Sequence, residues 1–290
     1  MSIKRMHKAY ASTRMGQIHY TSIGQGPALI MLCQSARSSA MFTNLATELA
    51  NDFSCYAIDY PGSGASDPLP EDATFEDIAL CMVDFLDDKG IDKTHVYGIH
   101  TGNKIGAALA AYSPKRIHKA VLAGQSHSLV ADNERRLYTV GKARQKLLNA
   151  TDERESTLLH WVDIFNEINK FWWDEHLVRN LTDTHLRNWA QQRVADEILS
   201  ANSMPALYRA NFAFDLNAAF SRISVPTLII EIQTPSEDHH IGRQGPTLLK
   251  LIPDSKLQTI EEKDFHGITL EHRHQDVATI LRQFLNEQAI

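Results

Sequence analysis

The sequence predicts an α/β fold: a mostly parallel sheet with helices on both faces and an inserted helical cap. Short apolar runs alternate with helical patterns through the first third of the 290 residues. Residues 131–220 then show helical spacing alone, after which strand-like runs return. Repeated strand and helix units favour parallel strands, because a parallel pair needs a long crossover connection. We therefore expect core segments at 1–130 and 221–290 around a helical cap at 131–220.

The expected strands are apolar runs that end at turn residues. Residues 17–23 alternate polar and apolar side chains and stop at a Gly-Gln-Gly-Pro sequence, as a hairpin strand would. The continuous apolar runs at 28–33 and 53–59 predict strands buried on both faces. Three later strand-like runs, 119–124, 225–232 and 256–260, are also expected to be strands.

The expected helices of the core lie between these strands. Residues 41–49 have helical periodicity, and a closing helix is expected over 275–285. A helix over 74–88 has Thr74 as its N-cap and Asp77 at the third helical position, which is close to a capping box. These helices alternate with the strands as an α/β sheet requires.

The bulk composition excludes several classes of protein. A formal charge of −6 and a pI near 6.1 give no reason to expect nucleic acid or an anionic membrane as a partner. No apolar run approaches the ~20 residues of a membrane span, and the basic N-terminus has no apolar signal-peptide core after it. The three cysteines fit a reducing compartment and lack zinc-type spacing. We expect a cytoplasmic protein that acts on a small molecule, with a homo-oligomer left open.

Nothing in the sequence predicts a cofactor. No glycine-rich phosphate loop is present, and Gly62-Ser63-Gly64 lacks the third glycine of a dinucleotide fingerprint. We therefore expect an activity that needs no cofactor.

The most informative motif is the turn at Val96-Tyr97-Gly98-Ile99-His100-Thr101-Gly102. An apolar strand leads into a Gly-x-His-x-Gly turn, and a small, helix-forming segment follows. This is the layout of a nucleophile elbow, where a strained strand-to-helix turn presents one side chain above the sheet. The glycines allow the close backbone approach that the turn needs. The residue at the tip is usually serine, and here it is histidine.

With the elbow and the insert in place, the chain resembles the α/β-hydrolase fold family, in the branch with a helical cap. The resemblance covers nearly the whole length, and four segments carry it in the expected order: 59–67, the elbow, 225–230 and 265–271. It implies that His266, on the loop after the last strand, is the histidine that relays protons. The alternative for His266 is an ordinary surface histidine.

The chain departs from the family pattern at the acid that orients this histidine. Simple counting places Pro235 at the position of that acid. A slightly longer loop would bring Asp238 or Glu237 into place, and Asp132 at the cap junction is a third option. We favour Asp238, against a solvated charged loop as the alternative.

The oxyanion loop departs as well. Alignment on the following helix places Cys33-Gln34-Ser35 where the family carries His-Gly-x. Gln34 would offer its side-chain amide, and Ser35 and Thr101 their backbone N–H groups, to developing negative charge. The alternative is a drifted loop that forms no hole. Cys33 is expected to be a small core residue rather than a nucleophile. Arg37 on the same loop could pair with a substrate carboxylate, or be a solvated arginine.

A histidine at the elbow leaves four hypotheses open. His100 could be a nucleophile that forms an acyl-imidazole, since a neutral imidazole is available near pH 7. His100 and His266 could instead be an acid–base pair, in hydrolysis or in cofactor-free C–C cleavage. Together with Asp238 they could bind a metal, although no local spacing demands it. Lastly, the chain could be an inactive ligand-binding protein. The retained His266, acidic loop and elbow glycines favour an enzyme with an atypical His-His-Asp site.

The cap carries all four tryptophans of the chain, together with several phenylalanines. Three consecutive aromatics, Phe171-Trp172-Trp173, span most of the circumference of a helix and are hard to bury completely. We expect Trp172 to contact the substrate, although cap core is the alternative for each of these residues. The sequence thus predicts hydrolysis of an ester, amide or lactone of a mainly apolar or aromatic small molecule.

Overall fold

The computed structural model describes residues 5–124, 184–235, 238, 242–261 and 270–287. Its centre is a sheet in the strand order β1-β2-β4-β3-β5-β6-β7-β8. The two pairs that involve β2 are antiparallel, and all other pairs are parallel. The strands are β1 His7–Thr13, β2 Gly16–Gly24, β3 Ala28–Leu32, β4 Ser54–Ile58, β5 Thr94–Ile99, β6 Ile117–Ala123, β7 Thr227–Gln233 and β8 Ser255–Glu261.

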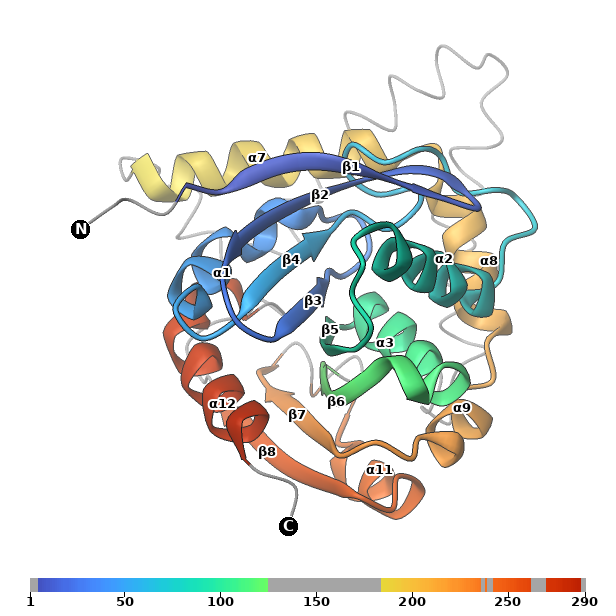
Figure 1. Ribbon diagram of the computed structural model, residues 1–290, viewed down its shortest axis with the longest axis vertical. Coiled ribbons are helices and arrows are strands. Elements are labelled where there is room, and N and C mark those ends of the chain that lie inside the picture. Colours follow the sequence, from blue (N-terminus) through green and yellow to red (C-terminus); the bar gives the residue numbers. More distant parts are fainter. Residues whose placement is uncertain (1–4, 125–183, 236–237, 239–241, 262–269, 288–290) are drawn as a thin grey trace.

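Helices cover both faces of this sheet (Figure 1). Helices α1 (Thr43–Leu49) and α12 (His274–Asn286) pack together on one face. Helices α2 (Phe75–Asp88), α3 (Thr101–Tyr112), α9 (Leu216–Arg222) and α11 (Gly245–Leu251) lie on the other. The predicted fold class, a mostly parallel sheet with helices on both faces and a helical insertion, is confirmed.

The sequence patterns explain why these elements form where they do. Thr74 accepts a hydrogen bond from the Asp77 N–H, and the Asp77 side chain accepts from the Thr74 N–H, so the capping box at the start of α2 is confirmed. The six residues of β5 are all buried, as expected for a central parallel strand. Among the described strands and α-helices of the core, the edge strand β1 and the short helix α11 were not predicted from the sequence.

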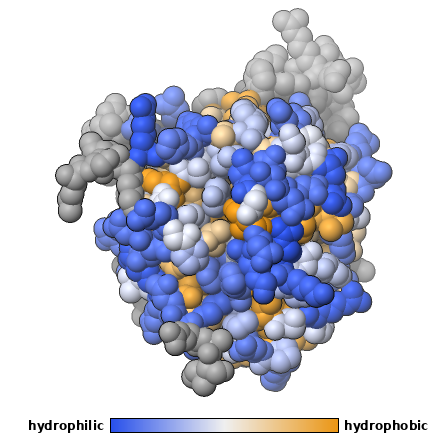
Figure 2. Space-filling model, in the orientation of Figure 1, coloured by the Kyte–Doolittle hydropathy of each residue, from blue (hydrophilic) through white to orange (hydrophobic). Residues whose placement is uncertain are grey.

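The segment between β6 and β7 contains three described helices, α7 (Thr184–Ser200), α8 (Met204–Ala213) and α9. The rest of the expected cap lies outside the described residues, so the boundaries of the cap domain stay a prediction. On the face shown in Figure 2, hydrophilic residues predominate and apolar ones lie scattered among them. Among the described helices, none is both long enough and apolar enough to cross a membrane.

Candidate active site

The turn between β5 and α3 has the geometry of a nucleophile elbow. His100 has a backbone φ of +49° and ψ of −106°, which is strained for a residue with a side chain. An added Cβ at Gly98 would lie 2.1 Å from the Gly102 carbonyl oxygen, and one at Gly102 would lie 1.9 Å from that of Leu32. Both glycines are therefore required by contacts between backbone segments, as the motif predicts.

The sheet register brings the loops of the site together at the carboxyl edge of the strands. Leu32 on β3 pairs with Gly98 on β5, so Gln34 and His100 each lie two residues beyond a paired position. On the other side, Ile99 pairs with Ala123 on β6, so His100 lies beside Gly124. In open α/β sheets this edge is where ligands bind.

The imidazole of His100 rests against Gly124. An added Cβ at Gly124 would lie only 2.7 to 2.9 Å from three atoms of the His100 ring. The neighbouring backbone is fixed by Asn103, whose amide donates to the carbonyl oxygens of Ala123 at 3.2 Å and Gly124 at 2.8 Å. Gly124 therefore provides the space that the histidine ring occupies. Sequence reasoning did not identify these roles of Gly124 and Asn103.

The expected oxyanion loop forms a tight turn after β3. The Arg37 N–H donates to the Gln34 carbonyl oxygen at 3.2 Å, and Ala36 within this turn has a φ of +58°. The Gln34 side chain is buried, and no donor among the described residues reaches its Oε1 atom. Thr101 begins α3, where the first N–H groups of a helix have no intrahelical acceptor. The structure thus brings Gln34 and Thr101 to the same edge as His100, and Ser35 follows Gln34 on the 34–37 turn.

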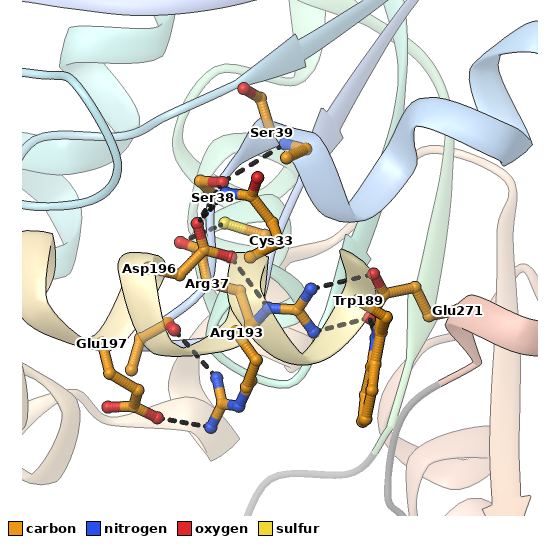
Figure 3. Close-up of polar contacts among 12 residues, drawn as sticks. Cys33, Arg37, Ser38, Ser39, Trp189, Arg193, Asp196, Glu197 and Glu271 are labelled. Atoms are coloured by element: carbon orange, nitrogen blue, oxygen red, sulfur yellow. Dashed lines mark hydrogen bonds and ion pairs between the residues drawn. The ribbon is translucent and has the colours of Figure 1, made fainter. Parts of the chain in front are cut away.

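Arg37 is buried rather than solvated. Its side chain is 1 % exposed and binds two carboxylates (Figure 3). Nη1 and Nη2 donate to Glu271 at 2.5 and 2.8 Å, and Nε donates to Asp196 of α7 at 3.0 Å. Although burial opposes the charged form, Glu271 and Asp196 raise the pKa of Arg37 above its usual value. Arg37 is therefore not a solvated arginine, and each of its guanidinium nitrogens already donates to a carboxylate of the protein. Its contact with a substrate carboxylate stays a prediction.

Asp238 has a different environment from that of a buried orienting acid. Its side chain is 45 % exposed, and it pairs with Arg243 at 3.0 Å. Its expected partner, His266, lies outside the described residues, as do Glu237, Asp132 and Trp172. The pairing of Asp238 with His266 stays a prediction.

Cys33 behaves as the core residue that we expected. It is fully buried, and its thiol donates to the Arg37 carbonyl oxygen at 3.2 Å. Burial, together with the charges of Asp59 and Asp196, raises the pKa of this thiol well above its usual range. A protonated thiol is a poor nucleophile, so the environment of Cys33 opposes covalent catalysis. In the described part of the chain, no group of three or more histidine, cysteine or acidic side chains is placed to hold a metal ion.

The elbow helix also contains a buried charge that sequence reasoning missed. Lys104 lies one turn after His100, is 2 % exposed, and donates to the Asn211 side chain on α8. The Lys104 N–H also donates to the His100 carbonyl oxygen. A lysine in an otherwise small, apolar helix was the available signal, since buried lysines are rare without a partner.

Comparison with known proteins identifies the family of this fold. Residues 27–266 match the family model for the alpha/beta hydrolase fold. The chain belongs to the α/β-hydrolase fold family. Solved structures show the same fold at low identity. They include the enol-lactonase from Burkholderia xenovorans LB400 (TM-score 0.75, 19 % identity, covering 96 % of this chain and 100 % of that one). A hydrolase from Pseudomonas aeruginosa PA01 has a TM-score of 0.73 at 19 % identity, covering 97 % and 99 % of the two chains.

Among curated proteins, the chain is similar to the carboxylesterase YbfK of Bacillus subtilis, with 29 % identity over 42 % of each chain. It is also similar to a pimeloyl-[acyl-carrier protein] methyl ester esterase of Nitrosomonas europaea, with 28 % identity over 40 % of this chain and 44 % of that protein. These matches span about two fifths of the relatives' lengths. The two curated relatives named here are thus esterases, and their names say nothing of a histidine nucleophile.

Proposed function

We propose that this protein is a hydrolase of an ester, amide or lactone, with His100 at the nucleophile position. The observation that carries the proposal is the strained backbone at His100, with φ of +49° and ψ of −106°. A sparsely populated conformation of this kind costs roughly 1–3 kcal/mol, and it persists where the surrounding structure imposes it, often at active sites. The glycine contacts impose that strain here and present the imidazole at the sheet edge.

In the proposed reaction, an unprotonated nitrogen of His100 attacks the acyl carbon. The bond to the leaving oxygen or nitrogen breaks, and His266 carries the ring proton of His100 to that leaving group. The product is a neutral acyl-imidazole. Water then attacks the acyl carbon, its proton returns to the His100 ring through His266, and the carboxylic acid leaves. Both half-reactions balance without a cofactor, and the names of the hydrolytic relatives support this type of chemistry.

Each half-reaction develops negative charge on the acyl oxygen. We assign its stabilisation to the Thr101 N–H, the Ser35 N–H and the Gln34 amide. This assignment is supported by the pairing of β3 with β5, because the two strands end at the same edge of the sheet. The 34–37 turn therefore lies beside the start of α3. Asp238 is retained as the proposed acid partner of His266. The aromatic cap segment that contains Trp172 supports a mainly apolar or aromatic substrate.

The test compares wild type with His100→Ala on a panel of aryl esters with small aliphatic and aromatic acyl groups. His7→Ala is the matched control, because His7 is an exposed histidine on the edge strand β1. We expect turnover by wild type and the control, and a loss of at least about 100-fold in His100→Ala, the lower range for removing a reacting group. Peptide mass spectrometry of rapidly quenched wild type should locate the acyl group on His100.

Turnover that survives in His100→Ala would refute the nucleophile role, as would an adduct on Ser35 or Cys33. Turnover that requires His100 but forms no adduct would favour the acid–base pair, including C–C cleavage for a suitable substrate. Tight ligand binding without turnover of any substrate would identify an inactive binding protein. The substrate class is tested by measuring the binding of aliphatic and aromatic carboxylic acids of equal charge to the protein. Tighter binding of the aromatic acids would support the proposed substrate class.

A further inference from the structure

The turn at residues 34–37 has an alanine, Ala36, at a position whose backbone conformation favours glycine. The Arg37 N–H closes the turn on the Gln34 carbonyl oxygen, and Ala36 is its third residue, with φ of +58°. A positive φ at this position of a turn favours glycine, because an alanine Cβ crowds the backbone there. The left-handed form is thus unfavourable for Ala36 by itself, and contacts from elsewhere must hold it.

Helix α7 supplies the decisive contact. Arg193 is 3 % exposed, and its Nη1 atom donates to the Ala36 carbonyl oxygen at 2.8 Å (Figure 3). Burial and the neighbouring charge of Arg37 lower the pKa of Arg193, while Glu197 pairs with its other guanidinium arm. A charge-assisted hydrogen bond in a buried setting is among the stronger ones. It fixes the orientation of the peptide that follows Ala36.

A second residue of α7 holds the other side of the turn. Asp196 lies three positions after Arg193, so both side chains emerge from one face of the helix. It accepts hydrogen bonds from Arg37 Nε at 3.0 Å and from Ser38 Oγ at 2.6 Å. The turn is thus held at Ala36, Arg37 and Ser38 by two side chains from a single helix.

The same cluster reaches the segment that follows His266. Arg37 binds both oxygens of Glu271, which also accepts a hydrogen bond from Trp189 Nε1 of α7 at 2.8 Å. Glu271 lies five residues after His266 in the sequence. Helix α7 is therefore tied to the turn and to the chain just beyond the expected proton-relay histidine.

We propose that Arg193 is a positioning residue that holds the 34–37 turn in its left-handed conformation for oxyanion binding. This inference rests on the hydrolytic function proposed above. It gives helix α7, which lies within the expected cap, a part in the chemical step. Loss of Arg193 would let Ala36 relax, and the Ser35 N–H would then leave its position without unfolding the protein.

The test is a cycle of Arg193→Met and Ala36→Gly. Methionine keeps the aliphatic length but donates nothing, and glycine accepts a positive φ readily. We expect Arg193→Met to lower kcat about 5- to 30-fold with little change in KM, the factor that corresponds to about 1–2 kcal/mol of left-handed strain. Adding Ala36→Gly should restore most of kcat, because the turn can then form without Arg193. Arg116→Met is the matched control, since Arg116 also donates to backbone carbonyl oxygens but far from the site.

The free energy of unfolding of the same variants provides a second test that does not require enzymatic activity. In wild type, Ala36 is held under strain, so Ala36→Gly should raise the unfolding free energy. In the Arg193→Met background the strain is already released, so the same substitution should raise the unfolding free energy by less. Equal effects of Ala36→Gly in the two backgrounds would overturn the proposal. So would an unchanged kcat in Arg193→Met, a loss confined to KM, or a kcat loss that glycine does not restore. Absence of turnover in wild type refutes the proposed function instead, and the stability cycle still decides the role of Arg193.

Discussion

Replacing Arg37 by methionine should destabilise the protein far more than the loss of a surface arginine. The guanidinium is 1 % exposed, and it separates the carboxylates of Asp196 and Glu271, which are 0 % and 14 % exposed. Removal of one partner of a buried ion pair costs about 3–5 kcal/mol, because the other charge stays buried without compensation. Asp196 retains hydrogen bonds from Ser38 and Gln192, and Glu271 retains one from Trp189. Because these donors remain, we expect the unfolding free energy to fall by about 3 kcal/mol, the lower end of that range.

The assay is urea unfolding at pH 7, followed by fluorescence and circular dichroism, with Arg14→Met as the matched control. Arg14 makes a similar two-pronged pair with Asp84, at 2.7 and 2.8 Å, but its side chain is 46 % exposed. An exposed pair contributes less than about 1 kcal/mol. In thermal unfolding, the Arg37 variant should lose roughly 6 °C in Tm, at about 2 °C per kcal/mol for a chain of this size.

A third variant identifies the cause of the loss. Arg37→Met combined with Asp196→Asn and Glu271→Gln removes the whole set of charges, so it should recover a large part of the stability that the single variant loses. A loss below about 1 kcal/mol in Arg37→Met would refute the buried-charge argument. A triple variant that is less stable than the single one would show that hydrogen bonding, not uncompensated charge, dominates the cluster.

Three further predictions follow from buried groups and close contacts. Burial, with help from nearby cationic groups, lowers the pKa of His95 to about 4, so this residue folds neutral and takes up its proton on unfolding. The unfolding free energy should therefore fall, by at most about 3 kcal/mol, as the pH drops from about 6.5 to 4. His95→Leu should flatten this dependence in urea titrations, whereas the exposed His7→Leu should not. Gly124→Ala should impair turnover by displacing the His100 ring, whereas Gly90→Ala, with a similar φ of +65° and open space around it, should leave turnover intact. Gly102→Ala should yield little folded protein, as judged by circular dichroism, because its Cβ would overlap the Leu32 carbonyl oxygen.

The sequence was sufficient for the fold and the elbow because both depend on local patterns. Buried parallel strands read as continuous apolar runs, and the Gly-x-His-x-Gly spacing encodes a backbone conformation within five residues. The edge strand β1 escaped prediction because most of its residues are exposed or partly exposed, which leaves little apolar periodicity. Its position is set by pairing with β2 rather than by burial.

The ion-pair cluster could not be predicted, because its members are remote in the sequence. Arg37 is 159 positions from Asp196 and 234 from Glu271, so only the folded chain shows that they meet. From the sequence, an arginine on the expected oxyanion loop could lie in solvent or contact a substrate. Its actual burial depends on where α7 crosses the loop. The role of Gly124 likewise depends on the register between β5 and β6.

The environment of His100 supports an adapted site more than a simple loss of serine. An imidazole is much larger than a serine hydroxymethyl group, and at an elbow it needs space beside the neighbouring strand end. That space exists because Gly124 has no side chain and a φ of +63°, with its carbonyl held by Asn103. The ring of this partly exposed residue is thereby supported on one side by backbone. A nucleophile or proton carrier needs such a fixed ring, since even about 1 Å of misplacement can cost a large factor in rate. The arrangement around His100 therefore favours a working imidazole, and Gly124→Ala tests the support without altering His100 itself.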